Sequence, residues 1–532
     1  MAIVSNPSQI LFNGILLSLL SASTLAGAAE ENVQLLVHPG DTLIGISQRY
    51  LDRPSRWPDL KALNKVPDEL RLVPGSHLQL PSRWLRWNVG AAEVVHVQGN
   101  VRDGNGTALS VGRKLKEGDR IDTGEGLLTL RLGSGATVLF PPASKARLGQ
   151  LREVPGTDLE RSVIDLESGS TESRVPPRQS GSRYEVRTPR VVTAVRGTRF
   201  RVAADEGGSR HEVVEGLVQV AGSRGRALLN PGQGVKTADG KVGVTEHLLP
   251  VPDLSSVPAT IERTVQKLMA PMMPGAIAWR WQVAADAEFT QVVQDAKTDQ
   301  PTWVLTGLPD GDYFLRLRAV AADGLEGLDA LRSFALRARP EPPLMRNPAS
   351  GGPVAGTPFL AWTQADGAAA VDLQIARDGA FHDLVLERQG LSATSLTLAA
   401  PLAPGQYFWR LASRRADGYR GPFGDVAVFQ QLAPTEMVPP SLEGESLRLA
   451  WSGPDDLRYQ VQLAGDAEFT QDVHNNDVVG TQLVLAKPAS GDHYVRTRPQ
   501  LADSPAPPWS ASQRFNVPGQ PWWLLLLLLP LL

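Results

Sequence analysis

Histidine, a common metal ligand and catalytic base, is scattered singly through this sequence, and cysteine is absent. No two of the eight histidines stand four residues apart, the spacing that puts two ligands on one face of a helix. The absence of cysteine excludes thiolate metal sites, thiol catalysis and disulfides. We therefore predict no cofactor and no metal. Each histidine is interpreted as a surface or loop residue: His38, His77, His96, His211, His247, His382, His474 and His493.

The segment most similar to a hydrolase nucleophile motif is Ala221-Gly222-Ser223-Arg224-Gly225. A nucleophile elbow needs a strand before the serine and a helix after it. Here the turn signal Asn230-Pro231-Gly232 follows, so a hairpin turn is predicted instead. Acidic pairs such as Asp455-Asp456 have no evident partner for acid–base chemistry and are predicted to be solvated. The chain is therefore predicted not to be an enzyme.

Length and charge limit the remaining classes of protein. A chain of 532 residues exceeds what one hydrophobic core can organise, so several domains are expected. The hydrophobic fraction of 42% and the charged fraction of 20% are typical of folded proteins. With 53 basic and 56 acidic residues the net charge is −3, so no overall field attracts nucleic acid, and none is predicted as a partner.

Both ends of the sequence are apolar. Residues 10–28 carry no charge and end in small residues, which predicts a signal peptide over 1–28 and export to the periplasm or cell envelope. A retained anchor or a misassigned start are the alternatives. The tail 519–532 is too short to span a bilayer, so it is interpreted as either a weak membrane contact or a sticky terminus.

Residues 33–81 predict a small unit in which two strands enclose two short helices. The run VQLLV is typical of a strand, Asp41 or Thr42 can cap a first helix, and Pro54-Ser55 can begin a second. Between them stand, in order, HPGDTL from His38, Ile46, Tyr50, WPDL from Trp57, Leu63-Asn64 and LVPG from Leu72. This set closely resembles the LysM family of peptidoglycan-binding modules.

The LysM resemblance implies a shallow groove between two loops that binds glycans containing N-acetylglucosamine. Carried over residue by residue, the glycan-binding residues are Gly40, Asp41, Thr42, Leu43, Leu72, Val73, Pro74 and Gly75. An alternative is that Gly40, Pro74 and Gly75 only turn the chain. For Asp41 and Thr42, capping and binding are compatible.

Residues 90–245 alternate apolar and polar residues between turn signals, which predicts an all-β domain. The stretch YEVRTP from Tyr184, followed by VRGT from Val195, resembles the FecR family's periplasmic β domain. Sensor-type members carry a cytoplasmic segment and a membrane span before that domain, and here a signal peptide and a LysM-like module take their place. Arg196 and Thr198 are interpreted either as partner contacts or as strand neighbours beside a turn at Gly197.

A Pro-rich linker is predicted over 246–274, with a short helix in IERTVQKLM from Ile261. Three repeats follow, over 275–340, 341–433 and 434–518. Each contains a related stretch: WQVAADAEFTQ from Trp281, LQIARDGAFHD from Leu373 and VQLAGDAEFTQ from Val461. The repeats resemble fibronectin type III or related immunoglobulin-like sandwiches. The predicted fold class is thus multidomain and mainly β, with a small α+β module at the N-terminus.

These observations predict a noncatalytic envelope protein that binds peptidoglycan through the LysM-like module. The FecR-like domain or the sandwich repeats are expected to bind another envelope protein. Two alternatives remain open: an envelope sensor or regulator of the FecR type, and a peptidoglycan hydrolase or its accessory protein.

Overall fold

The computed structural model describes residues 32–157, 159–177, 182–195, 197–502 and 505–519. The predicted signal peptide and the apolar tail lie outside these residues. The chain divides into two compact units. The first contains residues up to 251 together with 273–295 and 318–329, and the second contains 252–272, 296–317 and the chain from 330 onward.

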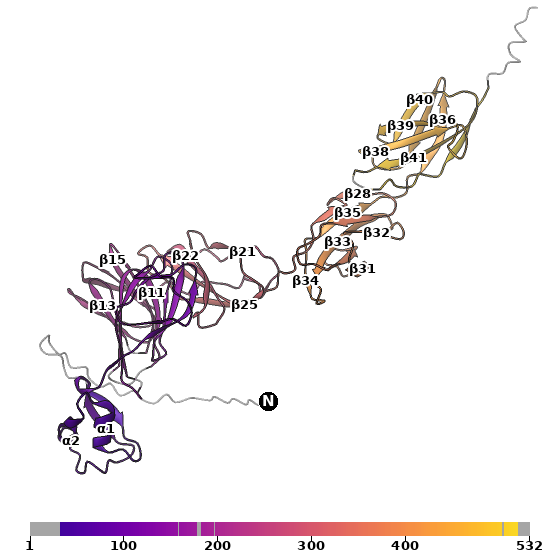
Figure 1. Cartoon of the computed structure of the whole chain (residues 1–532). Coiled ribbons are helices and arrows are strands. Elements are labelled where there is room, and N and C mark those ends of the chain that lie inside the picture. Colours follow the sequence, from indigo (N-terminus) through magenta and orange to yellow (C-terminus); the bar gives the residue numbers. More distant parts are fainter. Residues whose placement is uncertain (1–31, 158, 178–181, 196, 503–504, 520–532) are drawn as a thin grey trace, which may run out of the picture. The chain divides into compact units, whose positions relative to one another are not determined.

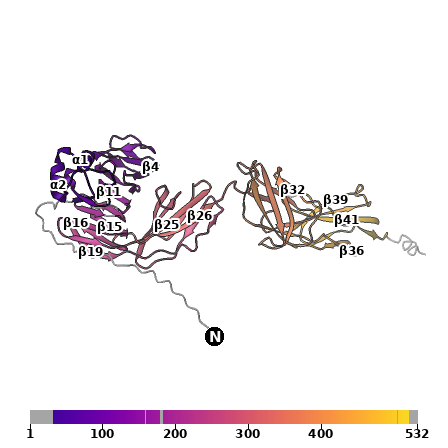
Figure 2. The same cartoon turned by 90° about the horizontal axis from the view of Figure 1, so that it is seen from below.

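The N-terminal module has the predicted order of strand, helix, helix and strand. Strand β1 (Asn32–Leu36) pairs antiparallel with β2 (His77–Pro81). Helices α1 (Leu43–Tyr50) and α2 (Trp57–Asn64) lie next to each other in both views, and η1 (Pro54–Arg56) connects them (Figure 1, Figure 2). The apolar side chains of both helices and both strands meet in one small core.

That small core extends beyond the predicted module. The connector η2 (Ser82–Trp84) leads to Leu85, which is buried in the same cluster. Two further members, Val154 and Leu159, come from the tip of a hairpin in the following β domain. The Arg161 guanidinium also lies 4.4 Å from the ring centroid of Trp87. The module therefore packs on the β domain through apolar contacts.

The β domain is built from 17 hydrogen-bonded strands, β3 to β19. Its longest strand, β11, pairs with β10 and β12 along its first half and with β9 and β14 along its second half, so it joins two sheets. The strands are β3 (Asn88–Val89), β4 (Ala92–Gln98), β5 (Arg102–Asp103), β6 (Lys114–Leu115), β7 (Arg120–Asp122), β8 (Leu127–Arg131), β9 (Thr137–Phe140), β10 (Lys145–Glu153), β11 (Glu160–Arg174), β12 (Arg183–Arg187), β13 (Val191–Val195), β14 (Arg199–Asp205), β15 (Gly208–Glu215), β16 (Val218–Gly222), β17 (Arg226–Leu229), β18 (Gln233–Ala238) and β19 (Lys241–His247).

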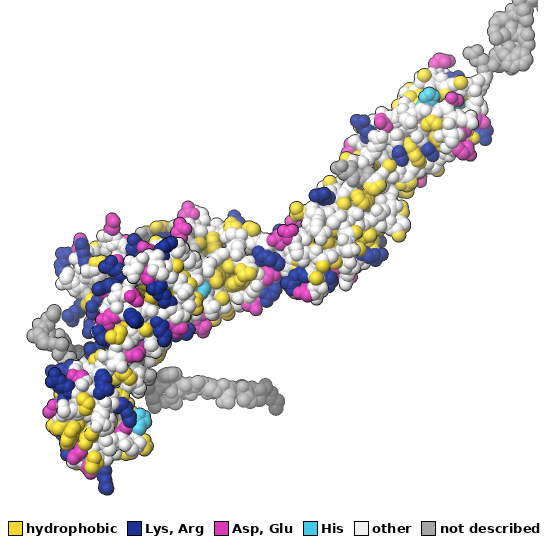
Figure 3. All heavy atoms as spheres, in the orientation of Figure 1, with side chains coloured by type: hydrophobic (Ala, Val, Ile, Leu, Met, Phe, Trp, Pro, Cys, Tyr) yellow, Lys and Arg dark blue, Asp and Glu magenta, His cyan; other side chains and the backbone are white. Residues whose placement is uncertain are grey.

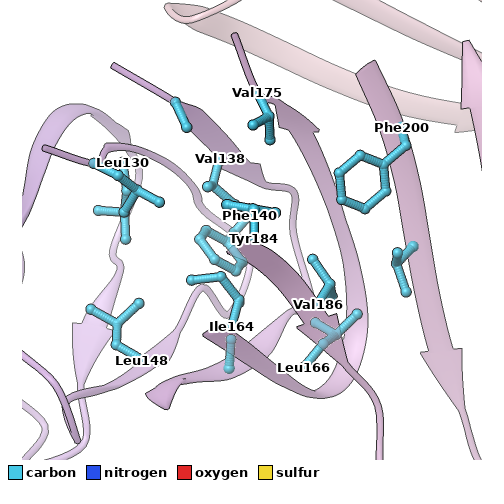
Figure 4. Packing of buried hydrophobic residues seen from close by; sticks show 14 of the residues in the cluster. Leu130, Val138, Phe140, Leu148, Ile164, Leu166, Val175, Tyr184, Val186 and Phe200 are labelled. Carbon is cyan, nitrogen blue, oxygen red and sulfur yellow. The ribbon is translucent and has the colours of Figure 1, made fainter. Parts of the chain in front are cut away.

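The core of the β domain lies between these sheets (Figure 4). Tyr184 and Phe200 meet edge to face, with ring centroids 6.1 Å apart. The Tyr184 hydroxyl lies 2.9 Å from Ser173 Oγ, so its polar end is satisfied inside the core. Alternation of apolar and polar residues along each strand produces this core, as the sequence predicted.

The strands of the first repeat are shared between the two units. Strand β22 (Ala276–Ala284) belongs to the first unit, whereas in the second unit β20 pairs parallel with β26, β21 pairs with β24, and β25 pairs with β26. Their bounds are β20 (Thr260–Ile261), β21 (Gln266–Met269), β23 (Val292–Thr298), β24 (Thr302–Leu305), β25 (Gly311–Ala321) and β26 (Ala330–Leu336). The helix predicted in IERTVQKLM is wrong, because β20 and β21 occupy this stretch and strand pairing overrides its local helical pattern.

The second and third repeats are sandwiches of two sheets around buried tryptophans, Trp362 and Trp409 in one and Trp451 in the other. The sheets of the second repeat contain β27 (Met345–Asn347), β28 (Gly352–Val354), β29 (Phe359–Trp362), β30 (Ala370–Ala376), β31 (Leu384–Leu391), β32 (Ser395–Thr397), β33 (Gly405–Arg414), β34 (Arg420–Phe423) and β35 (Ala427–Gln431). Those of the third contain β36 (Met437–Glu443), β37 (Ser446–Trp451), β38 (Arg458–Ala464), β39 (His474–Val479), β40 (Gln482–Ala486), β41 (Gly491–Gln500) and β42 (Gln513–Val517).

The motif shared by the repeats forms the same turn three times. In the first repeat the Asp286 carboxylate accepts hydrogen bonds from the backbone N–H groups of Thr290 and Gln291 at 3.1 and 2.7 Å. The phenylalanine within each turn has a left-handed backbone, with φ of 58° at Phe289, 60° at Phe381 and 57° at Phe469. These repeated aspartates therefore serve a structural role.

Candidate glycan-binding site

The two predicted loops of the site lie side by side because backbone hydrogen bonds join them. The Val37 N–H donates to the Ser76 carbonyl and the Gly75 N–H donates to the Val37 carbonyl, each at 2.9 Å. The Leu43 N–H donates to the Glu69 carbonyl at 2.9 Å. The first loop, 38–42, and the second loop, 70–76, are therefore held against each other by the ends of β1 and α1.

Aspartate and threonine of the first loop have different roles. Thr42 is the cap of α1, and its Oγ1 accepts a hydrogen bond from the Gly45 N–H at 3.0 Å. The Asp41 carboxylate instead accepts from the His38 N–H at 2.8 Å and lies 3.5 Å from Arg49. Of the two predicted caps, Thr42 is therefore the helix cap and Asp41 closes the loop.

The glycines turn the chain, as one of the two interpretations proposed. Gly40 has φ of 87° and Gly75 has φ of 84°, a conformation that costs other residues free energy. A Cβ at either position would meet no atom within 4 Å, so the requirement concerns the backbone conformation and not the space available. Both loops are consequently open to solvent beside these glycines.

Leu43 differs from the other predicted site residues because it belongs to the core. Its side chain is 0% exposed, and its N–H is already bonded to Glu69. Leu43 therefore presents neither its side chain nor its N–H to a ligand. Leu72 is half-buried, while Val73, Pro74 and Gly75 are exposed.

The site contains backbone N–H groups that have no hydrogen-bond acceptor within the described part of the protein. Among the described residues, the N–H groups of Gly40, Thr42, Leu72 and Val73 donate to no protein acceptor. Such groups need water or a ligand as acceptor. Hydroxyl and N-acetyl oxygens of a sugar fit this requirement.

Apolar surface accompanies these donors. Val73 is 70% exposed and Leu70 is 63% exposed, and both belong to the second loop. Hydrophobic side chains gather on the surface of this module at the lower left of Figure 3. A sugar ring packed on such residues would lie beside the free N–H groups.

The other residues considered as possible sites lie outside the N-terminal module. The segment 221–225 contains the end of β16 and the hairpin turn that connects it to β17. Arg196 lies outside the described residues, and the Thr198 side chain is buried. In the part of the chain that the structure describes, no cluster of histidines and carboxylates could bind a metal ion, and none of the helices is both long and apolar enough to cross a membrane.

One histidine contradicts its interpretation as a surface or loop residue. His211 is 0% exposed in β15, where Thr193 Oγ1 lies 2.7 Å from Nδ1 and Ser209 Oγ lies 2.8 Å from Nε2. Burial lowers the pKa of His211 to about 3, and the charge of Arg210 acts in the same direction. Its neighbours are all inside the β domain, so His211 is a structural residue of the core. The sequence signal was its place in the strand-forming run HEVVEGLVQV.

Comparison with known proteins supports two of the resemblances. The LysM domain family matches residues 36–81, and the FecR protein family matches residues 119–219. Both resemblances predicted from motifs are thereby confirmed, each for its own region. No curated protein matches the chain.

Similar solved structures include two crystal structures of a candidate anti-sigma factor from Parabacteroides distasonis. Each is 19% identical over 24% of this chain, with a TM-score of 0.21. The chain spans 59% of the length of that protein. The FN1–FN3 domains of chicken CNTN1 are 14% identical over 49% of this chain and 96% of theirs, with a TM-score of 0.22. Because these TM-scores are low, the evidence for the mainly β fold is the set of sheets described above.

Proposed function

We propose that this chain is a noncatalytic cell-envelope protein that binds peptidoglycan through residues 36–81. The observation that carries the proposal is the pair of cross-bonded loops with unpaired N–H groups at Gly40, Thr42, Leu72 and Val73. These donors, with exposed Val73, match the acceptors and apolar face of an N-acetylglucosamine ring. The LysM family match of the same residues supports this assignment.

The site should bind short glycans weakly. Its contacts are shallow and shared with water, and association must first offset several kcal/mol of lost rigid-body freedom. A polymeric sacculus offers many sites to many chains, which raises the effective concentration. Binding to insoluble peptidoglycan is therefore the appropriate measurement.

Sedimentation of the purified chain with insoluble peptidoglycan tests the proposal. We expect Val73→Ser to weaken binding about 3- to 10-fold, because it removes apolar contact worth roughly 1 kcal/mol. Val73 is 70% exposed, so the fold should not change. The matched control is Val111→Ser in the β domain, where the valine is 63% exposed.

Equal binding by both variants and the unchanged chain would place the glycan site elsewhere. The full chain is required for this experiment, because the core of the module includes Leu85, Val154 and Leu159. A fragment that ends at residue 82 lacks these three side chains. Its failure to bind would not separate loss of the site from loss of the fold.

A second candidate function, an envelope sensor or regulator, is favoured by the FecR match of residues 119–219. For this function a membrane-spanning partner must relay the signal to the cytoplasm. Deletion of the gene should then change transcription that depends on an alternative sigma factor. Unchanged transcription together with lost binding to peptidoglycan would favour the attachment function. A zymogram of the purified chain tests the third candidate, a hydrolase; among the described residues, no group of histidines and carboxylates could hold a metal ion for such a reaction.

A further inference from the structure

The first repeat is joined to the β domain by a buried network of charges. Arg318 of β25 donates to Glu172 of β11 at 2.6 Å and to Glu326 at 2.7 Å, and it is only 2% exposed. Glu212 of β15 accepts from Arg201 of β14 at 2.6 Å and from the Glu326 N–H at 2.7 Å. Positive and negative groups therefore alternate across this junction.

The carboxylates of the β domain form a row with an arginine between them. In the strand register Arg201 stands opposite Glu172 on one side and opposite Glu212 on the other. Arg201 also donates to the carbonyls of Glu326 and Gly327, both at 2.8 Å. A face of strands that carries carboxylates is thus the surface that receives the arginines of the first repeat.

The corresponding strand of the later repeats also carries arginines, but the position of Arg318 is Ala412 in the second repeat and Arg498 in the third. The stretches GDYFLRLR from Gly311, GQYFWRLA from Gly405 and GDHYVRTR from Gly491 place Arg316, Arg410 and Arg496 at one position. In the loop that follows, Arg420 replaces Glu326. Aromatic side chains, Phe423 and Trp509, replace Asp329.

In the second repeat the arginines stack on aromatic rings. The Arg410 guanidinium lies 4.0 Å from the ring centroid of Phe381 and 4.1 Å from that of Phe423. Arg420 lies 4.7 Å from the same Phe423 ring. The hydrogen-bond acceptor of Arg410 is neutral, since Nε donates to Gln374 Oε1 at 2.9 Å.

The third repeat has the same arrangement. Arg496 lies 3.8 Å from the Phe469 ring centroid, and Arg498 lies 4.1 Å from the Trp509 ring centroid. Their hydrogen-bond acceptors are again glutamines, Gln462 for Arg496 and Gln460 for Arg498. Each of these two repeats therefore presents a pair of guanidinium groups over aromatic rings.

No carboxylate of the described residues forms an ion pair with Arg410, Arg420, Arg496 or Arg498, whereas many other arginines of the chain are paired. Burial lowers the pKa of Arg410, and the nearby charge of Arg420 lowers it further. The same two causes lower the pKa of Arg496, with Arg498 as the neighbouring charge. Two like charges at close range without a counter-ion favour the approach of an anion.

We propose that these Arg–aromatic faces of the second and third repeats dock an acidic protein surface whose carboxylates project from neighbouring strands. The first repeat supplies the model for this contact, because the Arg318 side chain of its corresponding strand binds Glu172 and the Glu326 backbone N–H binds Glu212 of the β domain. Stacked guanidinium groups are pre-organised for bidentate binding of carboxylates. In the later repeats the partner must bring the carboxylates that Glu326 and Asp329 supply in the first.

Binding of the full chain to immobilised poly-L-glutamate at physiological salt tests this proposal. The test variant combines Arg410→Gln, Arg420→Gln, Arg496→Gln and Arg498→Gln. The control variant changes four arginines that already have carboxylate partners in the same repeats: Arg377→Gln, Arg415→Gln, Arg448→Gln and Arg514→Gln. Both variants lose four positive charges, so net charge does not distinguish them.

We expect the test variant to lose at least about tenfold in affinity and the control variant to change less than about twofold. A second variant, Arg420→Glu with Phe423→Asp, gives the second repeat the acidic residues of the first and should also weaken binding.

Equal losses in test and control variants, or no binding by the unchanged chain, would overturn the proposal. Tighter binding to polyphosphate than to poly-L-glutamate would show that the faces recognise phosphoryl groups. Thermal unfolding checks that each variant is folded, and none of these results depends on the glycan site.

Discussion

In the first repeat the arginine Arg318 is buried among carboxylates, whereas in the later repeats Arg410 and Arg496 lie between aromatic rings on a partly exposed face. All are carried by the corresponding strand of a related sandwich, with Arg318 two residues beyond the position that Arg410 and Arg496 share. The difference comes from the segment after that strand, where Glu326 and Asp329 are replaced by Arg420 and Phe423 of β34. A few loop residues thus decide whether a repeat face becomes an internal junction or an open surface.

The two arrangements also differ in what stabilises them. A buried ion pair is stable only when each charge keeps its partners, because desolvation costs several kcal/mol for each ion. An arginine stacked on an aromatic ring at a partly exposed site keeps contact with water and contributes less. Removing one residue should therefore have a large effect at the junction and a small one in the later repeats.

The largest effect is expected from Arg318→Met, which keeps most of the side-chain volume but leaves Glu172, Glu326 and Asp329 without this guanidinium. We expect a loss of about 3–5 kcal/mol in the free energy of unfolding of the β domain. Calorimetry of the full chain measures it. Arg448→Met is the control, because its pair with Glu443 is exposed and should contribute less than about 1 kcal/mol. Similar losses in both variants would mean that burial does not distinguish these pairs.

Acid should destabilise the β domain more than the later repeats, because the β domain contains the buried His211. His211 has a pKa of about 3 in the folded chain and 6.5 when unfolded, so the unfolded state binds more protons between these values. Stability of the β domain should be constant above about pH 7 and fall below pH 6.5 by up to about 1.4 kcal/mol per pH unit. Unfolding measured from pH 7 to 4.5 tests this.

His211→Gln should remove the fall in stability that His211 causes, since glutamine does not titrate. Glu326 contributes only below the window, because the neighbouring arginines hold its pKa far below its ordinary value of 4.5, whereas burial raises the pKa of Glu212, so protonation of Glu212 opposes the His211 effect. Arg280, Arg318 and Arg201 cause that depression, which outweighs desolvation. An unchanged slope in His211→Gln would assign the acid sensitivity to other groups.

The smallest effect is expected from Phe423→Ala, which removes the ring shared by Arg410 and Arg420. We expect a loss of about 1–2 kcal/mol in the stability of the second repeat. Phe423→Leu keeps most of the apolar area and should lose only about half as much. A loss as large as that of Arg318→Met would contradict the contrast between the two arrangements.

Much of the fold was predictable because it depends on local patterns. Strand alternation predicted the mainly β class, and the motif from His38 to Gly75 predicted the N-terminal module and its two loops. The helix at Ile261–Met269 was wrongly predicted, since short segments have helical patterns that strand pairing can override. Which of Asp41 and Thr42 caps α1 was left open by the sequence, and backbone geometry selects Thr42.

The sequence by itself determined the order of modules, the turn residues and the three-fold repeat, because each depends on residues close together in the chain. Tertiary structure decided which groups were buried. It placed Leu43 in the core instead of on the loop surface, and His211 inside the β domain. It also joined Glu172 of β11 to Arg318 of β25. These contacts connect residues far apart in sequence, and their energies depend on burial, which no local pattern specifies.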